Sequence, residues 1–104
     1  MAKVRAPSQP GEILLKEYLE PAGVSIGDFA KHIGLTEKVL TNFIESKTKI
    51  NMDKAYRLAK ATGTPVEFWL NLQQAVDVHA AKSDKELAEV VRGIKKFKFP
   101  AKAA

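Results

Sequence analysis

Residues 25–46 read SIGDFAKHIGLTEKVLTNFIES, and this stretch decides the fold. Ser25 is a favourable residue for the start of a helix. Gly34 suits the end of that helix, because glycine adopts the left-handed backbone conformation without steric cost. Thr36 offers a second helix start, and Glu37 in the first turn favours the helix dipole. The stretch therefore predicts two short helices joined by a tight turn.

The residues around the turn fit a helix-turn-helix unit. Ala30 lies four residues before Gly34, where a small side chain lets two helices cross closely, and Leu35 can fill the corner between them. The residues expected to face inward are Phe29, Ala30, Ile33, Val39, Leu40, Phe43 and Ile44. In such a unit the second helix lies in the DNA major groove, with its N-terminal residues at the base edges. We therefore predict a DNA-binding helix from Thr36 to about Ser46.

The solvent side of this second helix is polar. Asn42 can form two hydrogen bonds with an adenine edge, and Thr41 can bond a base or touch a thymine methyl group. Lys38 can reach guanine or phosphate. Glu37 can accept a hydrogen bond from cytosine but repels phosphate, so it is expected to add discrimination at some cost in affinity. These four residues are the predicted base-reading set.

Further polar groups suit contacts with phosphates. Lys47 and Lys49 follow the second helix closely, and Ser25 with the free N–H groups at the start of the preceding helix can hold another phosphate. The predicted DNA-binding residues are Ser25, Thr36, Glu37, Lys38, Thr41, Asn42, Lys47 and Lys49. The alternative is a plain helical bundle whose polar residues form a solvated face.

The flanking sequence predicts further helices and no favoured strand, so we expect an all-α bundle of five to six helices. The first runs from Gly11 to Glu20, with Pro10 at its entrance and Pro21 stopping it. A later helix is expected over 52–62, capped by Asn51, with Met52, Ala55, Leu58 and Ala59 facing inward. The next is expected over 65–82, capped by Thr64 and with Pro65 as its first residue. The last is expected over 84–94, capped by Ser83, with an apolar stripe of Leu87, Val90, Val91 and Ile94. The expected organisation is a flexible arm (1–9), a helical DNA-binding domain with C-terminal dimerisation helices (10–94), and a basic tail (95–104).

Composition restricts the classes of function. The chain has 104 residues, 45% of them apolar and 28% charged, which is typical of one globular domain. It has no cysteine, no long apolar stretch and no signal-peptide pattern, so we expect a cytoplasmic protein with no membrane partner. The net charge of +5 suits nucleic acid as a partner. The basic clusters comprise Lys47 and Lys49 in the centre and Lys95, Lys96, Lys98 and Lys102 in the tail.

Catalytic and metal sites are not predicted. His32 and His79 are not at metal-ligand spacing, and Glu12, Glu17 and Glu20 lie along one amphipathic helix as a solvated face. We therefore expect neither an enzyme nor a cofactor. The tail, with Phe97 and Phe99 among its lysines, is either a frayed basic end or an arm that orders on a partner. Lys3 and Arg5 in the N-terminal arm are candidates for contact with DNA.

Two motifs resemble the HigA antitoxin family, also described as virulence-associated or addiction-module antidote proteins. PGEILLKEYLEP (10–21) resembles the opening helix of the family, and TGTPVEFWLNLQ (62–73) resembles its signature after the DNA-binding unit. The resemblance covers about residues 10–78. It implies a dimer that binds a palindromic operator in its own promoter as a repressor. It also implies neutralisation of a partner toxin, usually a RelE-like mRNA endonuclease. Stand-alone repressors and protein-interaction modules without DNA binding are the alternatives.

Three residues depart from motifs related to this one. Ile26 stands where Gln is frequent, Glu37 where a basic residue is frequent, and Ser46 where Gly often ends the recognition helix. The resemblance therefore implies the fold and the docking mode but not the base sequence that is read.

The segment from Phe68 onward is densely apolar, and it permits two interpretations. Phe68 and Leu72 are expected to fill the core. Trp69 and Val76 on one helix, with Leu87 and Val91 on the next, are the candidate dimerisation residues, although they also suit a monomer core. A two-fold dimer places two recognition helices about one DNA turn apart.

Overall fold

The computed structural model describes residues 6–101, and every regular element in that range is helical. The elements are α1 (Pro10–Ile13), η1 (Leu14–Leu19), α2 (Glu20–Ala22), α3 (Ile26–Ile33), α4 (Glu37–Ile44), α5 (Met52–Thr62), α6 (Val66–Lys82) and α7 (Lys85–Arg92). The first three are one continuous helix, so the described chain contains six helices and the all-α class is confirmed. The predictions made for Lys3, Arg5 and Lys102 lie outside the described residues.

Pro21 does not stop the first helix, contrary to expectation. The helix continues through Pro21 to Ala22 and ends at Gly23, whose φ is 67°. A proline inside a helix clashes with the carbonyl group four residues earlier and lacks an N–H donor. The preceding turns are a π-helix, in which Glu20 N–H bonds to the carbonyl of Leu15. This wider turn accommodates the proline within the helix.

Side-chain caps begin the helices of the DNA-binding unit as predicted. The side-chain oxygens of Ser25, Thr36 and Asn51 each accept a hydrogen bond from the backbone N–H three residues later, at 3.1, 3.2 and 2.8 Å. Each bond satisfies an N–H group that the helix itself leaves free.

Two predicted caps are shifted by one residue. Pro65, not Thr64, is the N-cap of α6, because the hydroxyl of Thr64 instead accepts the indole N–H of Trp69 at 2.9 Å. Asp84, not Ser83, caps α7, and Ser83 ends α6. A buried indole N–H requires an acceptor, and that requirement outweighs the local preference at Thr64.

One core joins the first five helices. Its buried apolar residues are Leu14, Leu19, Ala30, Ile33, Leu40, Phe43, Ile44, Ile50, Ala55, Leu58, Ala59 and Trp69. Two residues predicted to face inward do not: Val39 is 37% exposed and Met52 is 57% exposed. Both lie in the first turn of their helices, where helical periodicity places a side chain on a face that no other helix covers. Trp69 is fully buried and stacks at a tilt on Tyr18, with a centroid distance of 5.9 Å.

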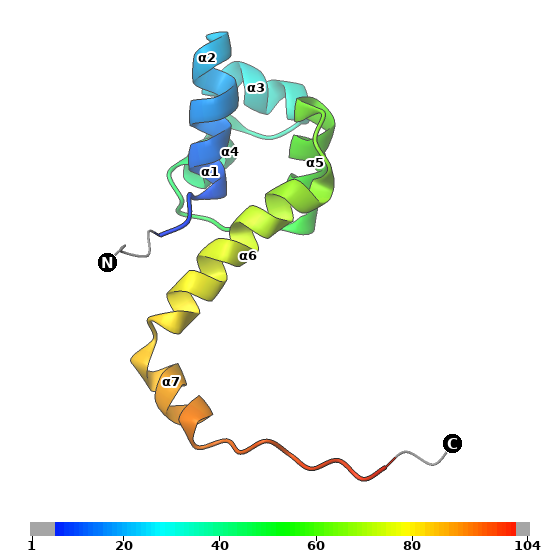
Figure 1. Ribbon diagram of the computed structural model, residues 1–104. Helices are drawn as coiled ribbons and strands as arrows, with labels where there is room; N and C mark the ends of the chain where they lie inside the picture. Colours follow the sequence, from blue (N-terminus) through cyan, green and yellow to red (C-terminus); the bar gives the residue numbers. More distant parts are fainter. Residues whose placement is uncertain (1–5, 102–104) are drawn as a thin grey trace.

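The C-terminal part of the chain projects from this bundle. In Figure 1, α6 leads away from the other helices, and α7 and the segment after it extend further still. The radius of gyration is 18.5 Å, whereas a compact chain of this length has about 13 Å. Every residue from 81 to 101 is exposed. No helix within residues 6–101 has the length and apolar character needed to cross a membrane.

Candidate nucleic-acid interface

The turn between α3 and α4 is tightly hydrogen-bonded. Gly34 has a φ of 79°, and the N–H of Leu35 bonds to the carbonyl of Ala30 at 2.9 Å. In this common helix ending, N–H groups just after the left-handed residue donate to the last free carbonyl groups of the helix. Ala30 itself is completely buried. The close approach of the two helices predicted from these residues is therefore present, and it fixes the orientation of α4 relative to α3.

Arg57 joins α5 to the end of α3. Its Nη1 donates to the carbonyl oxygen of Ile33 at 2.6 Å, and its Nε donates to Asp53 Oδ1 at 2.5 Å. A cation at the C-terminus of a helix is favourable for the helix dipole. Sequence reasoning missed Arg57, because its partner Ile33 is 24 residues away. The spacing of Asp53 and Arg57 was the available signal, since residues four apart meet on a helix.

The end of α4 has the same hydrogen-bond pattern as the end of α3, but without glycine. Ser46 has a φ of 63° and is the one residue other than glycine with a positive φ among residues 6–101. The N–H of Lys47 bonds to the carbonyl of Asn42 at 2.8 Å, and that of Ser46 to the carbonyl of Phe43 at 3.0 Å. The start of the following loop is thus tied directly to α4.

Most of the predicted DNA-binding residues lie on α4, at its N-cap or in the loop after it, whereas Ser25 is the N-cap of α3. Those with exposed side chains are Ser25, Thr36, Glu37, Lys38, Lys47 and Lys49, whereas Thr41 and Asn42 are half-buried. The hydroxyls of Ser25 and Thr36 accept bonds from Asp28 N–H and Val39 N–H. Each hydroxyl therefore keeps its own proton, which it can donate to a phosphate oxygen.

Glu37 lies against the first turn of α3. A Cβ atom placed on Gly27 would be 2.9 Å from Glu37 Oε1. A carboxylate near a helix N-terminus is favourable for the helix dipole. The phosphate that we expected at the start of α3 would therefore meet a negative side chain there.

The two lysines after α4 are paired with carboxylates. Lys47 Nζ lies 3.1 Å from Glu45 Oε1, and Lys49 Nζ lies 3.1 Å from Asp77 Oδ1. The hydrogen bond from Lys49, and then that from Gln73, holds the pKa of the Asp77 carboxyl below its ordinary value of 3.8. Exposed ion pairs of this kind contribute little to stability, so a phosphate can replace either carboxylate.

Gln73 on α6 holds the loop from the other side. Its Oε1 accepts the N–H of Ile50 at 3.0 Å, and its Nε2 donates to Asp77 Oδ1 at 3.1 Å. Gln73 is 8% exposed and is the one buried polar residue in the described part of the chain. The sequence offered no sign of this contact beyond a glutamine among apolar residues.

Comparison with known proteins identifies the family. Residues 15–69 match the helix-turn-helix family. The HTH-type transcriptional regulator YbaQ of Escherichia coli K12 is 39% identical over 85 residues, covering 82% of this chain and 75% of the relative. Antitoxin HigA-1 of Vibrio cholerae is 38% identical over 74 residues, covering 71% of this chain and 70% of the relative. The chain belongs to the HigA-type antitoxin family of helix-turn-helix proteins.

A solved structure of the HigA family also includes DNA. The Pseudomonas aeruginosa antitoxin HigA with the higBA promoter is 26% identical to this chain and has a TM-score of 0.77. The similarity covers 86% of this chain and 96% of that one. The helical arrangement described above is therefore shared with a HigA protein that was studied with its promoter.

The residues that we expected to form a HigA dimer surface differ in exposure. Trp69 is completely buried within the single chain, so its assignment to a dimer surface is corrected. Phe68, which was expected to fill the core, is 37% exposed and packs edge-on against Trp69. Val76 is half-buried, and Leu87 and Val91 are 44% and 54% exposed on α7.

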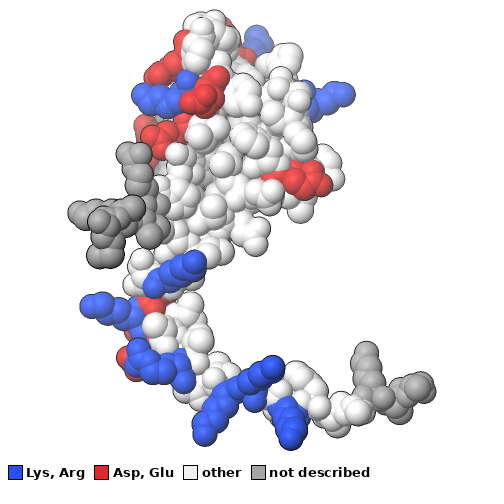
Figure 2. All heavy atoms as spheres, viewed as in Figure 1, with Lys and Arg blue, Asp and Glu red and all other residues white. Residues whose placement is uncertain are grey.

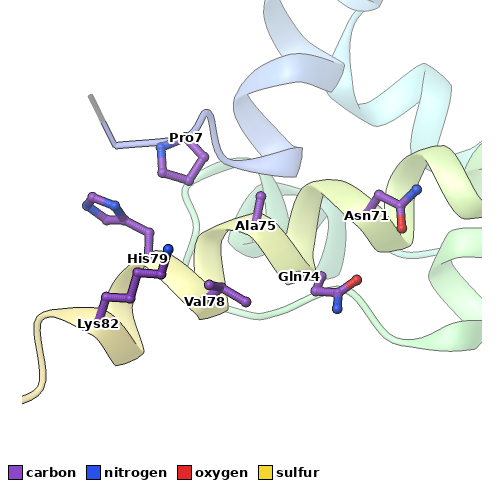
Figure 3. A pocket seen from close by; sticks show the side chains of 7 residues that line it. All are labelled: Pro7, Asn71, Gln74, Ala75, Val78, His79 and Lys82. Atoms are coloured by element: carbon purple, nitrogen blue, oxygen red, sulfur yellow. The ribbon is translucent and has the colours of Figure 1, made fainter. Parts of the chain in front are cut away.

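A shallow groove lies beside α6. Its volume is about 480 Å³, and its lining residues are Pro7, Asn71, Gln74, Ala75, Val78, His79 and Lys82. Figure 3 shows Ala75 and His79 on the side of α6 that faces Pro7. The ionisable residues of the groove are His79 and Lys82, without a carboxylate. Across residues 6–101, no three His, Asp or Glu side chains gather as metal ligands.

Positive charge is concentrated at the C-terminal end. Residues 82–104 contain seven of the 17 Lys and Arg residues but three of the 12 Asp and Glu residues. Figure 2 shows the basic side chains of the described part of this segment over α7 and the chain after it. The helical bundle itself is therefore close to neutral, and individual lysines near α4 matter more for DNA contact than its net charge.

Proposed function

We propose that this protein is the antitoxin of a type II toxin–antitoxin module. In this role it acts in the cytoplasm, binds its own operator DNA as a dimer, represses transcription, and neutralises a RelE-like mRNA endonuclease. The observation that carries the proposal is the combination of HigA-type sequence with an exposed, polar α4. The phosphate contacts that we propose are the exposed Thr36 at the start of α4 and the exposed Lys47 and Lys49 beyond its end. At Ser25 the nearby Glu37 carboxylate opposes a phosphate.

DNA binding is supported by the relative whose structure includes a promoter. In the docking mode general to helix-turn-helix units, we propose that Asn42, Thr41 and Lys38 face the base edges of the major groove. A palindromic operator requires two copies of α4 related by a two-fold axis. The exposed apolar residues of α7, with Val76 on α6, are the surface that we propose for this dimer.

The gene neighbourhood and co-purification test the antitoxin role. We expect a small basic toxin gene beside this one, and we expect the two proteins to co-purify when expressed together. Expression of the toxin alone should arrest growth, and expression of this chain should restore it. If no neighbouring protein binds this chain and it rescues no growth defect, the antitoxin role is wrong.

The alternative function is a stand-alone repressor without a toxin. It is favoured by the similarity to YbaQ, which is described as a transcriptional regulator. A gel shift with the chain's own promoter fragment at several salt concentrations tests the DNA half of both proposals. Phosphate contacts predict an affinity that falls steeply with salt. A protein-interaction module would show no shift of that fragment.

A further inference from the structure

We propose that Gln73 and Asp77 of α6 form a clamp that positions the C-terminal part of the 46–50 loop, and with it Lys49, for contact with DNA phosphates. This inference rests on the proposed DNA binding. It adds two positioning residues that lie outside the helix-turn-helix unit. Gln73 and Asp77 are four residues apart on α6, so their side chains lie on one face of that helix.

The clamp holds two consecutive residues of the loop. Gln73 Oε1 accepts the backbone N–H of Ile50, and Asp77 Oδ1 accepts the ammonium of Lys49. The bond from Gln73 Nε2 to the same Asp77 oxygen orients the amide, so that its oxygen faces Ile50. The four groups thus form a closed ring of contacts between α6 and the loop.

Within the clamp, burial makes the Gln73–Ile50 hydrogen bond stronger than the Lys49–Asp77 ion pair. Ile50 and Gln73 are each 8% exposed, so water cannot easily replace a missing partner of the Ile50 N–H. The Lys49 side chain is 74% exposed, and its ion pair with Asp77 is correspondingly weak. The clamp therefore fixes the backbone of the loop while the lysine head groups stay free to move onto phosphates.

The remaining anchors of the loop are the core packing of the buried Ile50 side chain and hydrogen bonds at the two ends of the loop. The Asn42 carbonyl holds the N–H of Lys47, and the Asn51 side chain caps α5. Neither bond restrains Thr48 or Lys49. The backbone of Lys49 is therefore positioned through its neighbour Ile50, which the Gln73 bond and core packing hold.

Amide hydrogen exchange of the full chain without DNA tests the clamp directly. In Gln73→Met we expect the Ile50 amide to exchange about tenfold faster or more, whereas the Leu40 amide within α4 keeps its rate. Gln74→Met is the matched control, because Gln74 is exposed on the same helix, and it should leave both rates unchanged. An unchanged Ile50 rate in Gln73→Met would overturn the clamp.

Asp77→Ala tests the same ring without disturbing the core. It removes the group that orients the Gln73 amide, so we expect the Ile50 amide to exchange about threefold faster. This variant keeps the proposal testable if Gln73→Met does not fold. No change in Ile50 exchange in Asp77→Ala would contradict the role of Asp77 as an orienting group.

The DNA consequence is read from the salt dependence of binding to the chain's own promoter fragment and to a random duplex. For Gln73→Met we expect a shallower slope of log affinity against log salt, by about 0.9 for each phosphate that the protein no longer neutralises. A wild-type slope together with faster Ile50 exchange would show that the clamp does not position DNA contacts. If the wild-type protein binds neither duplex, the proposed function fails, while Ile50 exchange still reports on the clamp.

Discussion

At the scale of single residues, the proposed base-reading and phosphate-contacting roles fall on side chains of different exposure. Asn42 and Thr41 are half-buried on α4, whereas Lys47 and Lys49 are exposed in the loop after it. A half-buried amide has few alternative orientations, which suits recognition of one base edge. Exposed lysines on flexible side chains suit phosphates, which are the same at every base pair.

Replacing Asn42 by Ala should weaken binding to the operator by about 1–3 kcal/mol, because alanine cannot form the two hydrogen bonds with adenine. Binding to a random duplex should change little. Gel shifts with both DNAs measure the difference, and Asn71→Ala on α6 is the control. Equal weakening on both DNAs would show that Asn42 is not a base-reading residue.

Replacing Lys47 by Ala should weaken operator and random DNA alike, because a phosphate contact carries no sequence information. The salt slope should become shallower by about 0.9. Lys16→Ala, which makes the same change in net charge on the first helix, serves as the control. Our placement of the phosphate-contacting loop is wrong if Lys47→Ala and Lys16→Ala bind identically.

Asp77 should titrate below the ordinary aspartate value of 3.8, with Lys49 as the main cause. A lowered folded pKa means that the Lys49–Asp77 pair stabilises the protein above the unfolded pKa, and this stabilisation disappears as the pH falls through the folded value. Carboxyl NMR of Asp77 measures the midpoint. In Lys49→Ala the midpoint should rise toward 3.8, and an unchanged midpoint would mean that Lys49 does not pair in solution.

At the scale of elements, the close approach of α1 to the end of α4 supports the reading helix. A Cβ atom placed on Gly11 would lie 2.7 Å from Ile44 Cα and closer still to the Phe43 carbonyl oxygen. Both are backbone atoms that cannot rotate away. Glycine at this position therefore allows the first helix to pack directly against the last turn of α4.

Gly11→Ala should lower the free energy of unfolding by about 1–3 kcal/mol, as expected for overpacking of a close contact. Urea denaturation measures this change. Gly93→Ala is the matched control, because its added Cβ would meet only the Val90 carbonyl oxygen at 3.5 Å and its φ is −78°. If both variants unfold at the wild-type urea concentration, α1 and α4 are not in close contact.

At the scale of the whole molecule, the chain divides into a packed bundle and an exposed C-terminal extension. The core ends at Trp69 and Gln73 on α6, and every described residue after 80 is exposed. An apolar stripe comprises Leu87, Val90 and Val91 on α7 and Ile94 just after it, and these residues are 44–68% exposed. A surface of this kind on a single chain is typical of a protein-interaction site.

Replacing Leu87 and Val91 together by Glu should convert the proposed dimer into a monomer, because two charges would be buried at the apolar interface. Light scattering coupled to gel filtration measures the mass. Lys85→Glu, on the opposite side of α7, should remain dimeric. A dimer that persists in the double variant would place the interface elsewhere.

The sequence by itself determined the helices and the turn of the DNA-binding unit. Local effects within one or two helical turns come from the N-caps Ser25, Thr36 and Asn51 and from the left-handed Gly34. Such effects can be predicted from the sequence without knowledge of the tertiary structure. The candidate base-reading residues on α4 were predicted from the same local pattern and stay a prediction. Helical periodicity failed where burial depended on distant elements, as at Val39 and Met52.

Only the tertiary structure decided which groups meet across the chain. Arg57 contacts Ile33 24 residues away, and Gln73 contacts Ile50 23 residues away. Trp69, predicted as a dimer surface, fills the core instead, because the first helix brings Tyr18 against it. The residue type of a hydrophobic or hydrogen-bonding side chain does not specify which distant residue it will contact. The packing of the helices around one core decides that contact.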